Sequence, residues 1–197
     1  MRTRPLLPMM EPMTVRVLGL LPLVAGLAIA AEVPSGGSLV HGRGYSGVIF
    51  PASSPEVREL LDITMSPSEI AGYWTPGARD VEALESRLGR TLRESRKHPE
   101  LLVPEVRPEC RAYFACKMAW IREHLTEFRR QYVGIVWKDG AKLIYVNCFP
   151  ISVSEELWPT DWRSQLVQVF DGSWWFWRIL YDVDRGKFIR LETNGEA

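Results

Sequence analysis

SWWFWRILYDV, residues 173–183, is the stretch that predicts the fold, because large apolar side chains recur in it at every second position. A period of two is typical of a strand with one buried face. The odd-numbered face is apolar throughout and is expected to meet the core; with the next strand it comprises Trp175, Trp177, Ile179, Tyr181, Val183, Ile189 and Leu191. The opposite face is expected to carry Trp174, Phe176, Arg178, Leu180, Asp182, Phe188, Arg190 and Glu192.

Other strands are predicted on both sides of this stretch. Segments with strand-like composition or alternation are residues 132–149, 165–170 and 187–193. The first of them has the pattern of a hairpin, in which Asp139-Gly140 favours a two-residue turn because both residues tolerate positive φ angles. A turn of that length pairs Ile135 with Ile144.

Two helices are predicted before the strands. Residues 76–96 begin with Thr75 as an N-cap and Pro76 in the first turn, and apolar side chains then recur at helical spacing. Residues 109–131 carry one apolar stripe, as expected of a helix that packs on a sheet. The stripe consists of Phe114, Met118, Ile121, Leu125 and Phe128.

Helices followed by an antiparallel meander indicate the α+β class. We expect an antiparallel sheet of four to five strands wrapped on the long helix 109–131, with the 76–96 helix preceding it. This order of elements resembles cystatin-like rolls. Cystatins inhibit cysteine proteases through a QxVxG hairpin and a Pro-Trp loop, whereas QYVGI (131–135) has its glycine one place early and Trp158 precedes Pro159. The resemblance therefore implies the topology and not protease inhibition.

Residues 1–30 have the layout of an export signal. Arginines precede an apolar run, Val17–Ala30, that is shorter than the ~20 residues of a spanning helix. We expect cleavage after Ala30, a flexible lead-in over residues 31–54, and a single domain over 55–197. The mature protein is expected in the periplasm or outside the cell, with no membrane span. The chain has 24 basic and 24 acidic side chains, so its balanced charge gives no basis for nucleic-acid binding.

The sequence contains no recognisable catalytic or metal-binding motif. His41, His98 and His124 lie in separate segments and lack metal-ligand spacing. GYSG around Ser46 falls short of the G-x-S-x-G motif of hydrolases. We therefore expect no catalytic residue, no metal and no cofactor, and a protein that is not an enzyme.

The three cysteines allow at most one internal disulfide. Cys110 lies on the apolar stripe and Cys148 on the core face of its strand, which favours a Cys110–Cys148 pair. A Cys110–Cys116 bridge requires a helix that starts at or after Cys116, because six helical residues rise about 9 Å and disulfide Cα atoms lie within about 7 Å. Three free thiols are the remaining alternative.

The outward sheet face is richer in aromatic side chains than a solvent-facing surface usually is. We expect it to dock a protein, a peptide or an envelope component, with the large rings supplying contact energy. The predicted partner-binding residues are Tyr145, Trp174, Phe176, Arg178 and, in the ELWPTDW loop, Trp158.

Three alternatives stay open. Residues 55–72 or the 76–96 helix can cover the aromatic face, which is then a second core. A ligand-holding or hydrolytic roll would instead have a cavity between sheet and helix, lined by Trp120, Trp137, Trp175 and Trp177. A purely structural module of a larger assembly is the third.

Overall fold

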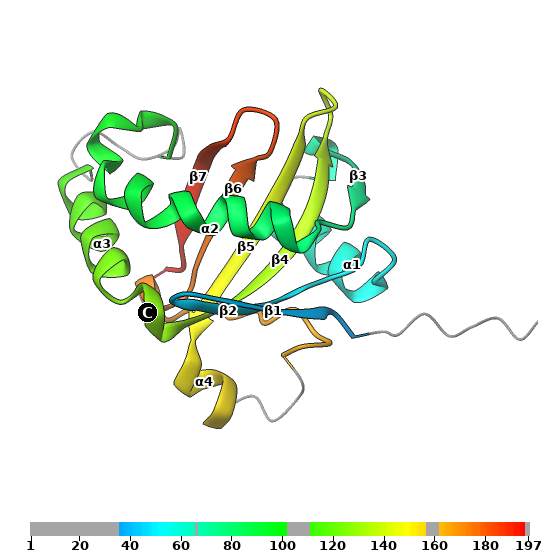
Figure 1. Ribbon diagram of the computed structural model, residues 1–197, viewed down its shortest axis with the longest axis horizontal. Helices are drawn as coiled ribbons and strands as arrows, with labels where there is room; N and C mark the ends of the chain where they lie inside the picture. Colours follow the sequence, from blue (N-terminus) through cyan, green and yellow to red (C-terminus); the bar gives the residue numbers. More distant parts are fainter. Residues whose placement is uncertain (1–35, 66, 102–110, 157–161, 196–197) are drawn as a thin grey trace, which may run out of the picture. The chain divides into compact units, whose positions relative to one another are not determined.

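The computed structural model describes residues 36–65, 67–101, 111–156 and 162–195. In this part of the chain an α+β domain is built on a seven-stranded, mostly antiparallel sheet (Figure 1). The predicted export signal lies outside the described residues. Within them, no helix is both long enough and apolar enough to cross a membrane.

The sheet has the strand order β1-β2-β4-β5-β6-β7, and β3 also pairs with β4. The strands are β1 (Ser38–Gly42), β2 (Tyr45–Ile49), β3 (Ile70–Trp74), β4 (Phe128–Trp137), β5 (Lys142–Pro150), β6 (Trp177–Asp182) and β7 (Lys187–Thr193). One edge of β4 is shared: β2 pairs with residues 129–132 in parallel, and β3 pairs with residues 134–137 in antiparallel. All other pairings are antiparallel. The predicted flexible lead-in 31–54 is therefore wrong, because it contains the β1–β2 hairpin.

The described α-helices are α1 (Pro55–Thr64), α2 (Ala78–Arg93), α3 (Arg111–Glu123) and α4 (Ile151–Glu156). The predicted 109–131 helix is too long, because Leu125–Glu127 forms a 3-10 turn and β4 begins at Phe128. Phe128 follows Leu125 at the helical spacing of three, so the apolar stripe continues past the end of the helix and hides the boundary in the sequence.

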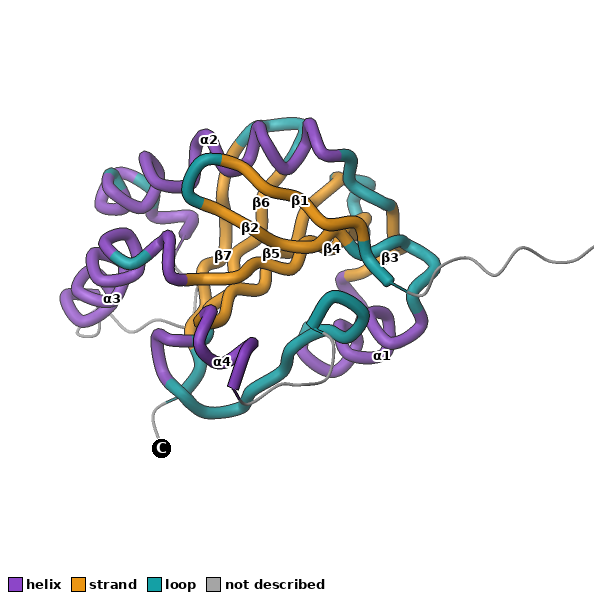
Figure 2. Tube along the Cα trace, turned by 60° about the horizontal axis from the view of Figure 1, so that its bottom comes forward, coloured by secondary structure: helices purple, strands orange, loops and turns teal. Residues whose placement is uncertain are grey.

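Both faces of the sheet are covered. The helix-side face is covered by α2 and α3, and the strap-side face by α1 and by residues 162–171, which we call the strap (Figure 2). The helix-side core includes Val81, Leu84, Leu88, Leu92, Ile144, Val146, Trp177, Ile179 and Tyr181. The strap-side core includes Val57, Leu61, Val133, Ile135, Leu143, Tyr145, Phe149, Trp162, Val167 and Leu180. Each fully buried aliphatic side chain of α2 stabilises the fold by about 1.5–3 kcal/mol.

The alternation predicted for β6 is found from Trp177 onward. Trp177, Ile179 and Tyr181 are buried on the helix side, and Leu180 is buried on the strap side. The prediction is wrong for the two preceding tryptophans, because residues 173–175 form a 3-10 turn after Gly172, whose φ is +98°. A turn breaks the period of two, so Trp174 packs on the helix-side core and Trp175 stays 42% exposed.

The predicted β4–β5 register is wrong by one residue. Ile135 lies opposite Leu143, and not Ile144, because the loop is longer than two residues: the Trp137 N–H donates to Ala141 O at 2.9 Å. A shift of one residue exchanges the faces of a strand. Ile135 therefore lies on the strap side, whereas Ile144 keeps its predicted place in the helix-side core.

The turn before β7 and a bulge within the ladder set the pairing of β7 with β6. Tyr181 lies opposite Phe188, and the register shifts between Arg178 and Leu180. Near the bulge Arg190 has a φ of +53°, a left-handed conformation that is uncommon outside glycine. Phe188, predicted to point outward, is buried on the helix side because the turn at residues 183–186 places it opposite Tyr181, whose ring it contacts.

Candidate binding pocket beneath the strap

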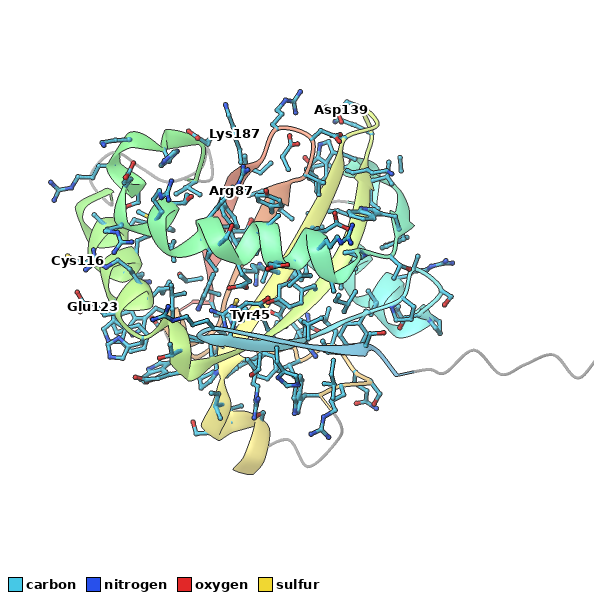
Figure 3. The ribbon with its side chains drawn as sticks, in the orientation of Figure 1. Tyr45, Arg87, Cys116, Glu123, Asp139 and Lys187 are labelled. Atoms are coloured by element: carbon cyan, nitrogen blue, oxygen red, sulfur yellow. The ribbon has the colours of Figure 1, made fainter. Side chains whose placement is uncertain are left out.

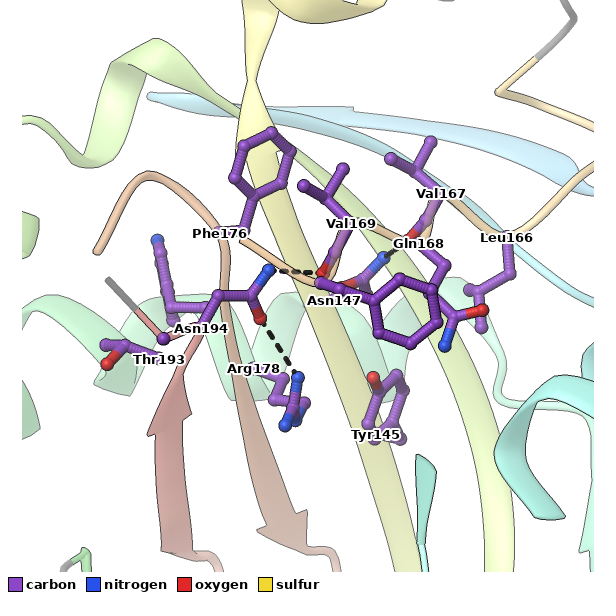
Figure 4. A pocket seen from close by; sticks show the side chains of 13 residues that line it. Tyr145, Asn147, Leu166, Val167, Gln168, Val169, Phe176, Arg178, Thr193 and Asn194 are labelled. Atoms are coloured by element: carbon purple, nitrogen blue, oxygen red, sulfur yellow. Dashed lines mark hydrogen bonds between the residues drawn. The ribbon is translucent and has the colours of Figure 1, made fainter. Parts of the chain in front are cut away.

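Three of the five predicted partner-binding residues line one pocket on the strap-side face. Tyr145 of β5 and Phe176 and Arg178 at β6 surround a cavity of about 230 Å³ that the strap borders on its other side (Figure 4). The remaining lining residues are Asn147, Leu166, Val167, Gln168, Val169, Phe170, Trp177, Thr193, Asn194 and Gly195.

The strap is attached to the sheet by side-chain amides instead of a strand partner. Gln131 is fully buried, and its Nε2 donates to Trp162 O at 2.6 Å and to Gln165 O at 2.7 Å. Its Oε1 accepts from the Val167 N–H at 2.8 Å and from Asn147 Nδ2 at 3.0 Å. All four hydrogen-bonding positions of this buried amide are thereby satisfied.

Two asparagines continue the attachment along the strap. Asn147 Nδ2 also donates to Val167 O at 2.7 Å. Asn194 Nδ2 donates to Val169 O and, at 3.0 Å, to Asp171 O. The bonded strap carbonyls from Gln165 to Asp171 thus fall at every second residue, which keeps this stretch extended. Residues 165–170, predicted as a strand, are not one, because side chains take the place of the backbone ladder.

Arg178 supplies the charge of the pocket. Its Nε donates to Glu192 Oε2 at 2.7 Å and its Nη1 to Asn194 Oδ1 at 3.2 Å. Glu192 Oε1 also accepts from Arg190 Nε at 3.1 Å, and Arg190 Nη1 donates to Glu69 Oε2 at 2.9 Å. The positive charges of Arg178 and Arg190 are balanced by the negative charges of Glu192 and Glu69. This polar side of the pocket is therefore held in place by ion pairs and carries no net charge.

Aromatic rings form the apolar side of the pocket. Tyr145 is buried, Phe176 is half-buried, and Phe170 of the strap is 77% exposed. An exposed ring next to a polar recess is the arrangement in which a partner gains the most by covering apolar area. Within the described residues, no group of three or more histidine, cysteine, aspartate or glutamate side chains is placed to hold a metal ion.

The other predicted partner-binding residues are not in the pocket. Trp174 lies on the other face, where its ring centroid is 6.1 Å from that of Trp120 and the Lys117 Nζ is 5.5 Å from its centre. Trp158 lies outside the described residues. The tryptophan-lined cavity of the alternative prediction is not assembled either, because Trp137 packs on the strap side and Trp177 on the helix side.

The cysteines occupy different environments. Cys148 is fully buried in the helix-side core with a free thiol, and burial raises its pKa. Cys116 is exposed on α3 (Figure 3). Because α3 is continuous from Arg111, the condition for a Cys110–Cys116 bridge is not met. Cys110 lies outside the described residues, so its pairing with Cys148 stays a prediction.

Gln131 and Asn194, which build the pocket by fixing the strap, were not predicted. The signal available was a single glutamine in the otherwise apolar half of a strand, QYVGIVW. Comparisons with protein-family models, with curated protein sequences and with solved structures find no match. The function must therefore be argued from the pocket itself.

Proposed function

We propose that the protein is an exported, non-enzymatic binding domain that docks a peptide or protein partner by taking one partner side chain into the pocket beneath the strap. The observation that carries this proposal is the convergence of Tyr145, Phe176 and Arg178 on one recess beside the exposed ring of Phe170. The predicted signal supports a location in the periplasm or outside the cell.

The size of the recess supports a side chain as its occupant. Pockets for drug-sized molecules measure roughly 300–1,000 Å³, and this one, at about 230 Å³, is smaller. A side chain with an apolar body and a hydrogen-bonding end fits the pairing of aromatic walls with Arg178 and the strap amides. Covering Phe170 then adds contact area outside the recess.

Selection of random linear peptides displayed on phage, followed by calorimetric titration of the selected peptide, tests the proposal. Replacing Phe170 by alanine is expected to weaken binding at least about tenfold, as truncation of an aromatic anchor does. Trp175→Ala is the matched control, since this ring is also exposed but lies away from the pocket. Equal affinities of wild type and Phe170→Ala, or a larger loss in Trp175→Ala, would contradict the proposal.

A further inference from the structure

A second cavity lies on the helix side, between the β1–β2 hairpin and α2. Its volume is about 570 Å³, which falls in the range of small-molecule pockets, roughly 300–1,000 Å³. Tyr45, at the start of β2, lies between the hairpin and α2 (Figure 3). The hairpin contributes Leu39, Val40 and Tyr45 to the lining, and α2 contributes Glu82, Glu85 and Ser86.

Glu85 is the buried polar group of this cavity, and its side chain is only 6% exposed. The Tyr132 hydroxyl donates to Glu85 Oε1 at 2.8 Å, and Arg130 Nε lies 2.9 Å from the same oxygen. Among the described residues Oε2 has no partner, so this oxygen of the carboxylate is available to a ligand. This oxygen is not among the fully buried side-chain atoms that lack a partner, and Glu85 lines the cavity, so the oxygen can accept a hydrogen bond from a ligand there.

The charge around the cavity favours a cation. Arg130 cannot reach a ligand, because it is 1% exposed and its Nη1 and Nη2 donate to backbone carbonyls at 3.1 Å each. Glu85 and Glu82 both raise the pKa of Tyr45, after the larger effect of burial, whereas Arg130 lowers it. The side chains of His41, Arg43 and Glu82 are exposed, so solvent and salt screen their charges, whereas Glu85 is buried.

We propose that this cavity is a second ligand site and that it binds a small organic cation, an amine with a hydrocarbon or aromatic body. The ammonium group donates to Glu85 Oε2. The body of the ligand packs on Leu39, Val40 and the ring of Tyr45, where a cation–π contact is also available. This site is on the opposite face from the pocket beneath the strap.

Three isosteric probes test the charge preference: phenylpropylamine, phenylpropanol and phenylpropionate, titrated at neutral pH into the full chain and followed by NMR. The amine is expected to bind more tightly than the alcohol by about tenfold or more, the usual worth of a hydrogen bond to a charged group. Phenylpropionate is expected not to bind in this cavity. Equal binding of the amine and the carboxylate would overturn the proposal.

Variants test the location. Glu85→Gln is expected to remove the advantage of the amine over the alcohol, whereas Glu94→Gln, which makes the same change of net charge outside the cavity, is expected to retain it. Ala78→Trp fills the cavity from an exposed position of α2 and is expected to abolish binding of the amine even if Glu85→Gln fails to fold. Phe170→Ala is expected to leave amine binding unchanged. Amine binding that survives Ala78→Trp, or that is lost in Phe170→Ala, would overturn the proposal.

Discussion

Replacing Gln131 by leucine is the sharpest test of how the strap is held. The substitution preserves the buried volume approximately but removes four hydrogen bonds, those to Trp162 O, Gln165 O, the Val167 N–H and Asn147 Nδ2. Each such bond contributes about 1 kcal/mol net to stability. The additional apolar burial of leucine offsets about 1 kcal/mol. The expected loss is therefore about 3 kcal/mol in the free energy of unfolding.

Urea denaturation measures this loss, and amide hydrogen exchange shows where it arises. In the variant, the Val167 amide is expected to exchange much faster, because its acceptor, Gln131 Oε1, is gone. Gln165→Ala is the control, since the Gln165 side chain is exposed and only its carbonyl is used; its stability is expected to change by less than about 0.5 kcal/mol. The reasoning is refuted if Gln131→Leu keeps both the stability and the Val167 protection of the wild type.

Three further predictions concern other parts of the fold. Gly134→Ala is expected to destabilise the protein in urea melts by about 1–3 kcal/mol, since the added Cβ would lie 2.2 Å from Trp74 O; a loss below about 0.5 kcal/mol would mean that β3 can move away freely. Cys148 is expected to react with a thiol reagent only on unfolding, because it is fully buried and burial raises its pKa, whereas the exposed Cys116 should label in the native state; mass spectrometry after timed labelling would reveal the reverse order. Burial raises the pKa of Glu85 despite the opposing effects of Arg130 and Tyr132. The contribution of this carboxyl to the free energy of unfolding is therefore fully present below its ordinary pKa and is lost as pH rises through the raised pKa. Wild type should accordingly lose stability relative to Glu85→Gln over that window, and parallel pH profiles would contradict the shift.

Alternation of side chains was sufficient to predict the orientation of β6, because Trp177, Ile179 and Tyr181 are all large and apolar. The same rule failed wherever a single residue changed the backbone geometry. At the 3-10 turn of residues 173–175 the backbone is left-handed at Gly172 and Ser173, and near the bulge it is left-handed at Arg190; a glycine marks only the first of these two places. Side-chain hydrophobicity carries no information about such insertions.

The long-range pairings could not be predicted for a different reason. β2 pairs in parallel with β4 across about eighty residues of chain, and β1 and β2 lie in a segment rich in glycine and serine that reads as a linker. Their burial depends on the β4 edge being available, which is a tertiary property. The strap is a similar case, because its extended form depends on Gln131, Asn147 and Asn194 from three separate parts of the chain.

For the candidate site, residue type and strand parity were sufficient to predict that Tyr145, Phe176 and Arg178 lie on one face of the sheet, and all three line the pocket on the strap side. Trp174 was included only because the strand was extended three residues too far. The sequence did not show which segments cover this face. In the structure, α1 and the strap pack on most of it and leave one small recess in place of a broad aromatic surface.

The central claim is that binding takes place beneath the strap, and an amide NMR titration with the selected peptide tests it most directly. The account predicts the largest shift changes for residues 166–170 and for the backbone around Arg178, with the indole signals of Trp120 and Trp175 unmoved. Changes centred on those two indoles, with the strap amides unaffected, would contradict it.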